Sequence, residues 1–523
     1  MSRHVMRVTA LALGLAGLLT ASSLPAGAGP SDTGLKGAID TILSDPRLDG
    51  AAAGVVVADA ATGDSLYQRN GGDRLMPASN TKIATSVAAM ALLGPEYRFR
   101  TEVLATARPK GGVLRGDLYL RGTGDPTTLA RDYDALAARV AAAGVRRVAG
   151  RLVADDTRFD DNRLGRSWAA DDESSYYSAQ ISPLTVAPDT DYDSGTVIVE
   201  ASPAPRAGAK PLVALTPATR YVRVDNRATT VPAGRPGTLT VERAHGTNTI
   251  TVKGEIPVQG TPTKEWITVQ EPTGYAAAVF ADALAAHGVR VTGPARLGVA
   301  TPSAAKPLAV HTSMPLKDLM RPFMKLSNNM HAEALTKTIG HQVEGRGTWS
   351  AGLAAVDAYL RQEDVETATI RQVDGSGLSR MNLFPAAQLA RLLVAVQDAP
   401  WYADWHASLP VACAPDRAEG GTLRSRMCGT PAALNARAKT GSLTGASALS
   451  GYVTDAGGRL LVYSVVLNNH LASSVKSIED AIVVTLARSD TAANTIRPAA
   501  PQRARSAEPS AGLECSWRKP QPC

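Results

Sequence analysis

The stretch MPASNTKIATSVAAM, residues 76–90, begins with polar residues and continues as an apolar helical pattern. Its large apolar side chains recur at the spacing of one helix face: Ile83, Val87 and Met90. The pattern predicts a buried helix from about 79 to 92. Just before it, residues 51–70 have the pattern of two strands joined by a tight turn. A strand pair is therefore expected to lead directly into the helix.

Ser79 and Lys82 stand on the first turn of this helix, where packing requires neither. Residues three apart share a helix face, so the Lys82 amine can reach the Ser79 hydroxyl. A helix amino terminus also favours developing negative charge, which suits an attacking serine. The pKa of Lys82 must then be lowered by burial or by a second cation. The alternative is a Ser79 helix cap beside a solvated Lys82.

Two later stretches favour catalysis. Ser327, Asn328 and Asn329 lead into a helical pattern, where a hydroxyl can relay a proton and an amide can hold a substrate. The stretch KTGS lies on or next to a strand and supplies a cation, two hydroxyls and a glycine that permits close approach of a substrate backbone: Lys439, Thr440, Gly441 and Ser442. Each stretch alone also fits a helix cap or an edge-strand turn.

Strand patterns occur at both ends of the chain, so one sheet is expected to be assembled from both. Residues 436–486 have the pattern of a strand pair followed by a helix. Residues from about 100 to 300 are rich in Val, Thr, Gly and Pro, with helical patches near 131–144 and 275–287, and are expected to form one or two inserted lobes. The fold class is α/β (α+β).

The first 28 residues have the pattern of a secretory signal peptide: Arg3 and Arg7, an apolar run, and small residues before Gly29. No later run of about 20 apolar residues indicates an integral membrane anchor. The formal charge of +7 owes much to this leader and to a basic tail over 491–523, which is expected to be flexible. The nearly neutral remainder argues against nucleic acid.

The cysteine number is even, as expected of disulfides in an exported chain. Local pairs Cys413–Cys428 and Cys515–Cys523 are plausible among three connectivities. Neither these cysteines nor the scattered histidines form a metal-binding pattern, and HAEAL at 331 lacks the second histidine of zinc proteases. No metal or organic cofactor is predicted.

S-x-x-K, S-x-N and K-T-G in this order are typical of penicillin-binding proteins and serine β-lactamases. The long insertion between Ser79 and Ser327 resembles the D-alanyl-D-alanine carboxypeptidase/endopeptidase family of low-molecular-mass class C penicillin-binding proteins, of the penicillin-binding protein 4 type. GTGDPT at 122–127, expected to be a structural turn, and DGSGLSRMN at 374–382 are similar to segments of that family.

The resemblance implies a serine β-lactamase/DD-peptidase-like domain with a central antiparallel sheet flanked by helices. The implied division is a signal peptide over 1–28, a discontinuous peptidase domain over 29–100 and 300–490, a β-rich insertion over 101–299, and the tail over 491–523. The protein would be secreted, or would lie outside the cytoplasm in association with the cell envelope.

The substrate implied is a peptidoglycan stem peptide ending in D-Ala-D-Ala, or a crosslink with a free carboxylate. Ser79 would attack with Lys82 as base, the backbone N–H groups of Ser79 and Ser442 would form the oxyanion hole, and Ser327 would pass a proton to the leaving group. The remaining roles are a substrate amide contact by Asn329, the second cation at Lys439, carboxylate binding by Thr440 and Ser442, and cleft lining by Leu378. Ser376 lacks the spacing of a hydrolase nucleophile.

Three rival functions share parts of this pattern. A secreted β-lactamase has the same acylation machinery, but EDVET at 363–367 lacks the Leu and Asn of the class A deacylation loop. A cell-wall binding protein would use the insertion alone, and a simple esterase would use the Ser–Lys pair. In the insertion, Tyr176 or Tyr177 is a candidate substrate contact. β-Lactam antibiotics are expected ligands, and the oligomeric state is not predicted.

Overall fold

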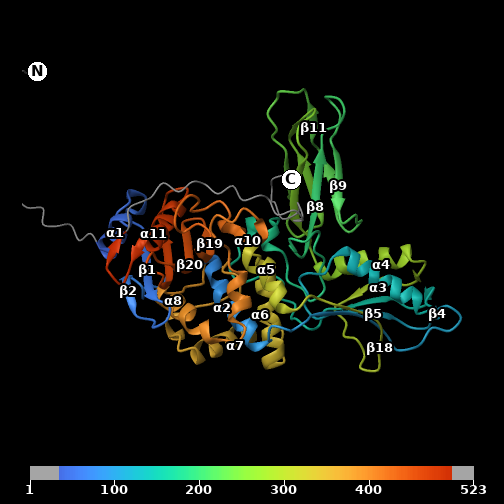
Figure 1. Cartoon of the computed structure of the whole chain (residues 1–523). Coiled ribbons are helices and arrows are strands. Elements are labelled where there is room, and N and C mark those ends of the chain that lie inside the picture. The colour runs from blue at the N-terminus through green and yellow to red at the C-terminus, as the bar shows by residue number, and fades with distance from the viewer. Residues whose placement is uncertain (1–33, 497–523) are drawn as a thin grey trace, which may run out of the picture.

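The computed structural model describes residues 34–496 of the chain (Figure 1). The predicted signal peptide over 1–28, the Cys515–Cys523 pair and most of the predicted tail lie outside the described residues. Residues 491–496 form a turn and the short strand β23 (Thr495–Ile496), which pairs with β22 (Ser489–Asp490).

The central sheet is assembled from both ends of the chain, as the sequence predicts. Its strand order is β19-β20-β21-β1-β2, and every neighbouring pair is antiparallel. The strands are β1 (Ala52–Asp59), β2 (Ser65–Arg69), β19 (Arg437–Leu443), β20 (Ala446–Thr454) and β21 (Leu460–Asn468). The predicted strand pair near the carboxyl end is present as β20 and β21, and β19, which carries the third motif, precedes it and lies at the edge of the sheet.

Helices cover both faces of this sheet, which explains its continuous apolar strands. In β1, Val55 and Val57 pack toward α1 (Leu35–Ile42) and α11 (Lys476–Arg488), whereas Val56 packs in the helical cluster on the other face. That cluster is formed by the helices α2 (Thr81–Leu92), α5 (Leu316–Leu326), α6 (Asn329–Glu344), α7 (Trp349–Gln362), α8 (Ala386–Ala395) and α9 (Tyr402–Ser408).

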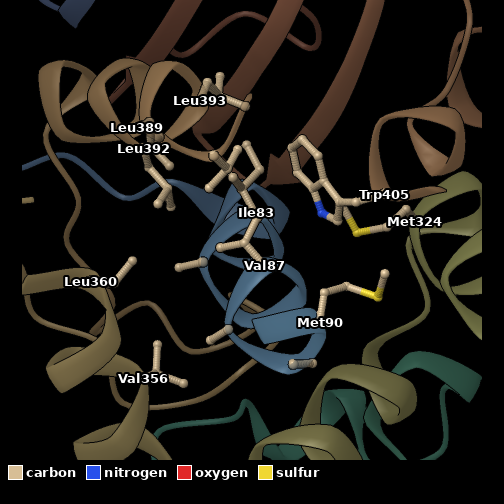
Figure 2. Close-up of a cluster of buried hydrophobic side chains, with 14 of the residues drawn as sticks. Ile83, Val87, Met90, Met324, Val356, Leu360, Leu389, Leu392, Leu393 and Trp405 are labelled. Carbon is tan, nitrogen blue, oxygen red and sulfur yellow. The ribbon is translucent and has the colours of Figure 1, made fainter. Parts of the chain in front are cut away.

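Helix α2 runs through the middle of the helical cluster, so almost all of its side chains are buried. Figure 2 shows the predicted stripe of Ile83, Val87 and Met90 surrounded by apolar residues of four other helices. The surrounding residues are Met324, Val356, Leu360, Leu389, Leu392, Leu393 and Trp405. This packing holds the amino end of α2 in a fixed position relative to the sheet.

The segment between α2 and α5 forms two further parts, which Figure 1 shows beside and above the helical cluster. The first part is a mixed sheet with strand order β17-β7-β5-β3-β18, a small sheet β16-β6-β4, and two packed helices. Its elements are β3 (Arg100–Ala105), β4 (Val113–Leu114), β5 (Leu118–Gly122), α3 (Ala130–Ala142), β6 (Arg147–Val148), β7 (Leu152–Asp155), α4 (Pro272–Ala286), β16 (Arg290–Val291), β17 (Arg296–Leu297) and β18 (Lys306–Thr312).

The second part is an arm of short strands that projects from the molecule (Figure 1). It consists of β8 (Thr196–Ser202), β9 (Leu212–Thr216), β10 (Arg223–Asn226), β11 (Thr229–Val231), β12 (Thr240–Arg243), β13 (Thr249–Lys253), β14 (Glu255–Pro257) and β15 (Thr263–Thr268). Both helical patches predicted in the insertion are present as α3 and α4. Strand β18 pairs with β3, so the sheet of the insertion extends past residue 300.

Within residues 34–496, no helix is long and apolar enough to cross a membrane.

Candidate active site

Ser79 lies in a short 3₁₀ turn, η2 (Ala78–Asn80), immediately before α2. The helix predicted from residue 79 thus starts two residues later, because this turn has the tighter i to i+3 pattern. The side-chain amide of Asn80 donates to Ser450 Oγ of β20 at 2.7 Å, which ties the turn to the sheet. The predicted pair is in contact: Lys82 Nζ lies 2.9 Å from Ser79 Oγ.

Lys82 is completely buried and bonded on several sides. Its Nζ lies 2.6 Å from Asn329 Oδ1 and 2.8 Å from the carbonyl oxygen of Ser376. Burial lowers the pKa of Lys82 to about 7, against the opposing effect of the Glu333 and Asp374 carboxylates. An amine with this pKa is partly unprotonated at neutral pH and can accept a proton.

Burial is the first of the two causes that the sequence predicts for the low pKa of Lys82, and it acts on both lysines of the site. Burial is the cause at Lys82, and it is also the larger cause at Lys439, whose pKa lies well below its ordinary value. The physical reason is that removal of an ammonium group from water disfavours its charged form strongly. The charge of Lys82 is the second cause at Lys439.

Ser327 and Asn329 lie at the junction between α5 and α6. Ser327 has a φ of +61°, which ends α5, and α6 begins at Asn329. This sharp change of direction brings the hydroxyl and the amide to different lysines. Lys439 Nζ donates to Ser327 Oγ at 2.7 Å, whereas Asn329 Oδ1 contacts Lys82. The second motif therefore bridges the first and the third.

Gly441 lets β19 pass close to the turn that carries Ser79. A Cβ at Gly441 would lie 2.6 Å from the Pro77 carbonyl oxygen and 3.1 Å from the Ser79 backbone nitrogen. The sequence predicts that this glycine admits a substrate backbone, and in the structure it also allows close approach of the protein's own backbone. On the same strand, Thr440 Oγ1 donates to Thr422 Oγ1 at 2.8 Å.

These elements surround a cleft of about 430 Å³. Both candidate tyrosines of the insertion reach it. The predicted residues in its lining are Ser79, Tyr176, Tyr177, Ser327, Asn329, Leu378, Thr440 and Ser442. Lys82 and Lys439 are buried behind this surface. The structure therefore brings all the predicted site residues together at one cleft or directly beneath it.

Glu333 and Asp374 form a buried carboxylate pair that the sequence analysis did not single out. Glu333 accepts hydrogen bonds from the backbone N–H groups of Gly375 and Ser376, at 2.9 and 2.8 Å. Asp374 accepts from the N–H of Gly377 at 2.8 Å. Burial, and then repulsion by Asp374, raise the pKa of Glu333 above its ordinary value. Through these hydrogen bonds, the two carboxylates hold the loop in which the Ser376 carbonyl contacts Lys82.

The disulfide Cys413–Cys428 is present, as predicted, with a sequence separation of 15. It closes the loop that carries Thr422, a cleft residue without any motif of its own. No sequence pattern indicates Thr422, because only the fold brings it into contact with Thr440 at the cleft.

Three other features of the sequence supply no side chain to the proposed reaction. GTGDPT forms the turn between β5 and α3, in which Asp125 Oδ1 accepts from the Thr127 N–H at 2.9 Å. Ser376 is completely buried, and its Oγ accepts from the Leu378 N–H. Glu363 and Asp364 of EDVET line a separate hollow beside β1, β2 and α8. Among the residues that the structure describes, no cluster of three or more His, Cys, Asp and Glu could hold a metal ion.

A serine in contact with a buried lysine of low pKa, beside the edge strand of an antiparallel sheet, is the arrangement of a serine hydrolase that forms an acyl-enzyme.

Comparison with known proteins identifies the family. The model of the D-Ala-D-Ala carboxypeptidase 3 (S13) family matches residues 35–489. A D-alanyl-D-alanine carboxypeptidase from Actinomadura sp. (strain R39) is 47% identical over 488 residues, covering 93% of this chain and 90% of the relative. The crystal structure of penicillin binding protein 4 (dacB) from Haemophilus influenzae has a TM-score of 0.73 at 25% identity, covering 86% of this chain and 98% of that one. A second crystal structure of that protein, complexed with a novel β-lactam, has a TM-score of 0.68 at 24% identity, covering 86% and 97%.

The chain belongs to the D-Ala-D-Ala carboxypeptidase 3 (S13) family. It is a serine-type D-Ala-D-Ala carboxypeptidase of the penicillin-binding protein 4 type, which confirms the family and the α/β fold class that the sequence motifs predict.

Proposed function

We propose that this carboxypeptidase acts through an acyl-enzyme on Ser79, with Lys82 as the general base. The supporting observation is the 2.9 Å contact between Ser79 Oγ and Lys82 Nζ, where burial lowers the pKa of Lys82 to about 7. Lys82 accepts the hydroxyl proton as Ser79 Oγ attacks the penultimate D-alanine carbonyl. The peptide C–N bond breaks and the serine ester forms.

Ser327 delivers the proton that the leaving nitrogen needs. Its Oγ lies at the cleft surface and accepts a hydrogen bond from Lys439 at 2.7 Å, so the hydroxyl proton is free to point at the substrate. The terminal D-alanine departs as an amine. Water then attacks the ester on Ser79, and the shortened peptide leaves with a new carboxylate.

The backbone N–H groups of Ser79 and Ser442 are the proposed donors to the oxyanion, because Gly441 brings these two segments close together. Thr440 and Ser442 donate hydrogen bonds to the terminal carboxylate of the substrate, for which the Thr440 hydroxyl turns away from Thr422. A carboxylate beside Lys439 favours the ammonium form of that lysine, so the positive charge is strongest when a substrate is bound.

The upstream part of the substrate contacts Leu378, the Asn329 amide and Tyr177. Tyr177 lines the cleft, and its hydroxyl donates to Asp172 Oδ1 at 2.7 Å, which holds the ring in place. These contacts orient the scissile carbonyl relative to Ser79.

The substrates are peptidoglycan stem peptides and crosslinks that end in a free carboxylate, so the protein has endopeptidase as well as carboxypeptidase activity. β-Lactams acylate the same serine, in agreement with the H. influenzae relative that was crystallised with a β-lactam. The leader pattern over 1–28 supports an extracytoplasmic location, where such substrates occur.

The test is release of D-alanine from a pentapeptide ending in D-Ala-D-Ala. The Ser79→Ala and Lys82→Ala proteins should release none above background, while retaining the wild-type circular dichroism spectrum. Ser65→Ala, on the exposed side of β2, is the matched control and should keep full activity. Release of D-alanine by the Ser79→Ala protein at a rate near that of the wild type would refute the assignment.

A further inference from the structure

The second motif is anchored to the insertion by its middle residue, Asn328, which the three-motif pattern leaves without a role. Asn328 is buried, and its side-chain Nδ2 lies within hydrogen-bond distance of three acceptors. These acceptors are the carbonyl oxygens of Asp191 at 3.3 Å and Tyr192 at 3.1 Å, and Asp193 Oδ1 at 3.0 Å. All three belong to one inserted segment, so Asn328 joins the motif to that segment.

The inserted segment is itself held on two sides. The Arg417 guanidinium donates to Asp191 Oδ1 at 2.8 Å, and both side chains are largely buried. Arg417 belongs to the loop closed by the disulfide. On the other side, the Trp266 indole N–H of β15 donates to Asp189 Oδ2 at 2.9 Å. A segment fixed in this way can serve as a rigid support for the second motif.

Asn329 also contacts the insertion, and this contact fixes the direction of its amide. Its Nδ2 donates to the Tyr177 carbonyl oxygen at 2.8 Å, while its Oδ1 contacts Lys82 Nζ at 2.6 Å. A carbonyl oxygen can only accept. A rotated amide would place its oxygen against the Tyr177 carbonyl and its NH₂ group against Lys82. The insertion therefore requires the Asn329 oxygen to face the lysine.

We propose that Asn328 is a positioning residue, which ties the second motif to residues 191–193 so that the Asn329 oxygen faces Lys82 and Ser327 faces Lys439. The insertion is thus a part of the catalytic framework as well as a lobe beside it. This inference rests on the proposed roles of Ser79 and Lys82. Without the anchor, the junction between α5 and α6 loosens, and the Asn329 amide no longer has a single orientation.

The test must separate this role from a second one, since Asn328 Oδ1 also caps α6 by accepting from the His331 N–H at 3.2 Å. Serine is as good a cap as asparagine, but it is too short to reach residues 191–193. Asn328→Ser therefore removes the anchor and keeps the cap. Asn328→Asp is the second variant, because it keeps the shape and the cap and places an oxygen against three acceptors.

Asn435→Ser is the matched control. The Asn435 amide also joins two segments, through the carbonyl oxygens of Thr454 at 2.8 Å and Pro431 at 3.1 Å, but Asn435 is not among the cleft residues. The rate of acylation by benzylpenicillin is measured across the neutral pH range for the folded fraction of each protein.

Asn328→Ser should lower the maximal acylation rate by about tenfold to a hundredfold, the effect of misplaced catalytic groups. The acid limb of its pH profile should also move to lower pH, because the Asn329 oxygen no longer favours the ammonium form of Lys82. Glu333, Asp374 and Lys439, the other charged groups around this lysine, are unchanged. Asn328→Asp should lose at least as much, and Asn435→Ser should acylate at the wild-type rate.

Wild-type rates and pH profiles in both Asn328 variants would overturn the anchor. So would a lowered rate with an unmoved acid limb, because a general loss of packing would have that effect. Acylation of the Ser79→Ala protein, in contrast, would refute the proposed function itself, so the two failures are distinguishable.

Discussion

The burial of Lys82 predicts that the catalytic base destabilises the fold in a pH-dependent way. An unfolded lysine keeps its ordinary pKa of 10.5, whereas burial lowers the pKa of Lys82 to about 7 in the folded protein. Between these values the unfolded chain binds more protons, so the free energy of unfolding rises with pH. Below about pH 7 Lys82 is protonated in both states. Burial of the charged amine then lowers the free energy of unfolding by its full amount, on the order of 5 kcal/mol.

The perturbation that tests this is Lys82→Met, which keeps an unbranched side chain of similar length and removes the charge. At about pH 6 the wild type still loses the full amount of unfolding free energy through burial of the charged Lys82. At about pH 9 this loss has fallen to about 2 kcal/mol, which remains because the unfolded lysine still holds its proton there. Relative to the variant, the wild type should therefore gain about 3 kcal/mol between these two pH values. The variant also leaves the Asn329 and Ser376 oxygens without this donor, but that loss is nearly the same at every pH.

The assay is urea unfolding of both proteins at several pH values, followed by circular dichroism. Lys325→Met is the matched control, because Lys325 has a completely buried side chain and a pKa lowered by burial to about 8. It should show the same effect in a higher pH window and should still be acylated by penicillin. Parallel pH dependences for the wild type and the Lys82→Met protein would refute the reasoning, because they would mean that this lysine titrates alike in both states.

Three further predictions follow from other contacts. Thr440→Val should reduce kcat/KM at least about tenfold more for peptides with a free terminal carboxylate than for the corresponding amides, since it removes a hydrogen bond to a charged group; equal losses would contradict the carboxylate role. Glu333→Gln should slow penicillin acylation and lower the free energy of unfolding by about 1–3 kcal/mol, because one amide oxygen cannot satisfy both backbone N–H groups of the loop that carries Ser376; wild-type acylation rates in stopped-flow measurements would count against it. Replacing Cys413 and Cys428 by serine should lower that free energy by about 3 kcal/mol, the value expected for a loop of this length, and an unchanged urea midpoint would refute this.

The elements near the site could be predicted because their signals are local. The stripe of Ile83, Val87 and Met90 has the period of a helix, and the strands on either side of residue 457 alternate or are continuously apolar. The start of α2 was placed two residues early, because a 3₁₀ turn and the first turn of an α-helix have the same i, i+3 signature in a sequence.

The parts of the site that could not be predicted depend on contacts between distant segments. Glu333 looks like an ordinary helical glutamate, and its burial beside Asp374 follows only from the position of a loop some 40 residues further along. The contact of Asn328 with residues 191–193 likewise joins segments far apart in the chain.

The most direct test of the account is the intact mass of the purified protein over several hours after addition of benzylpenicillin, with the Ser79→Ala protein beside it. A stable adduct of one penicillin per chain, absent from the variant, is the expected result. Rapid loss of the adduct with release of hydrolysed penicillin would identify a β-lactamase instead. An adduct of equal size on the Ser79→Ala protein would contradict the central claim that Ser79 is the nucleophile.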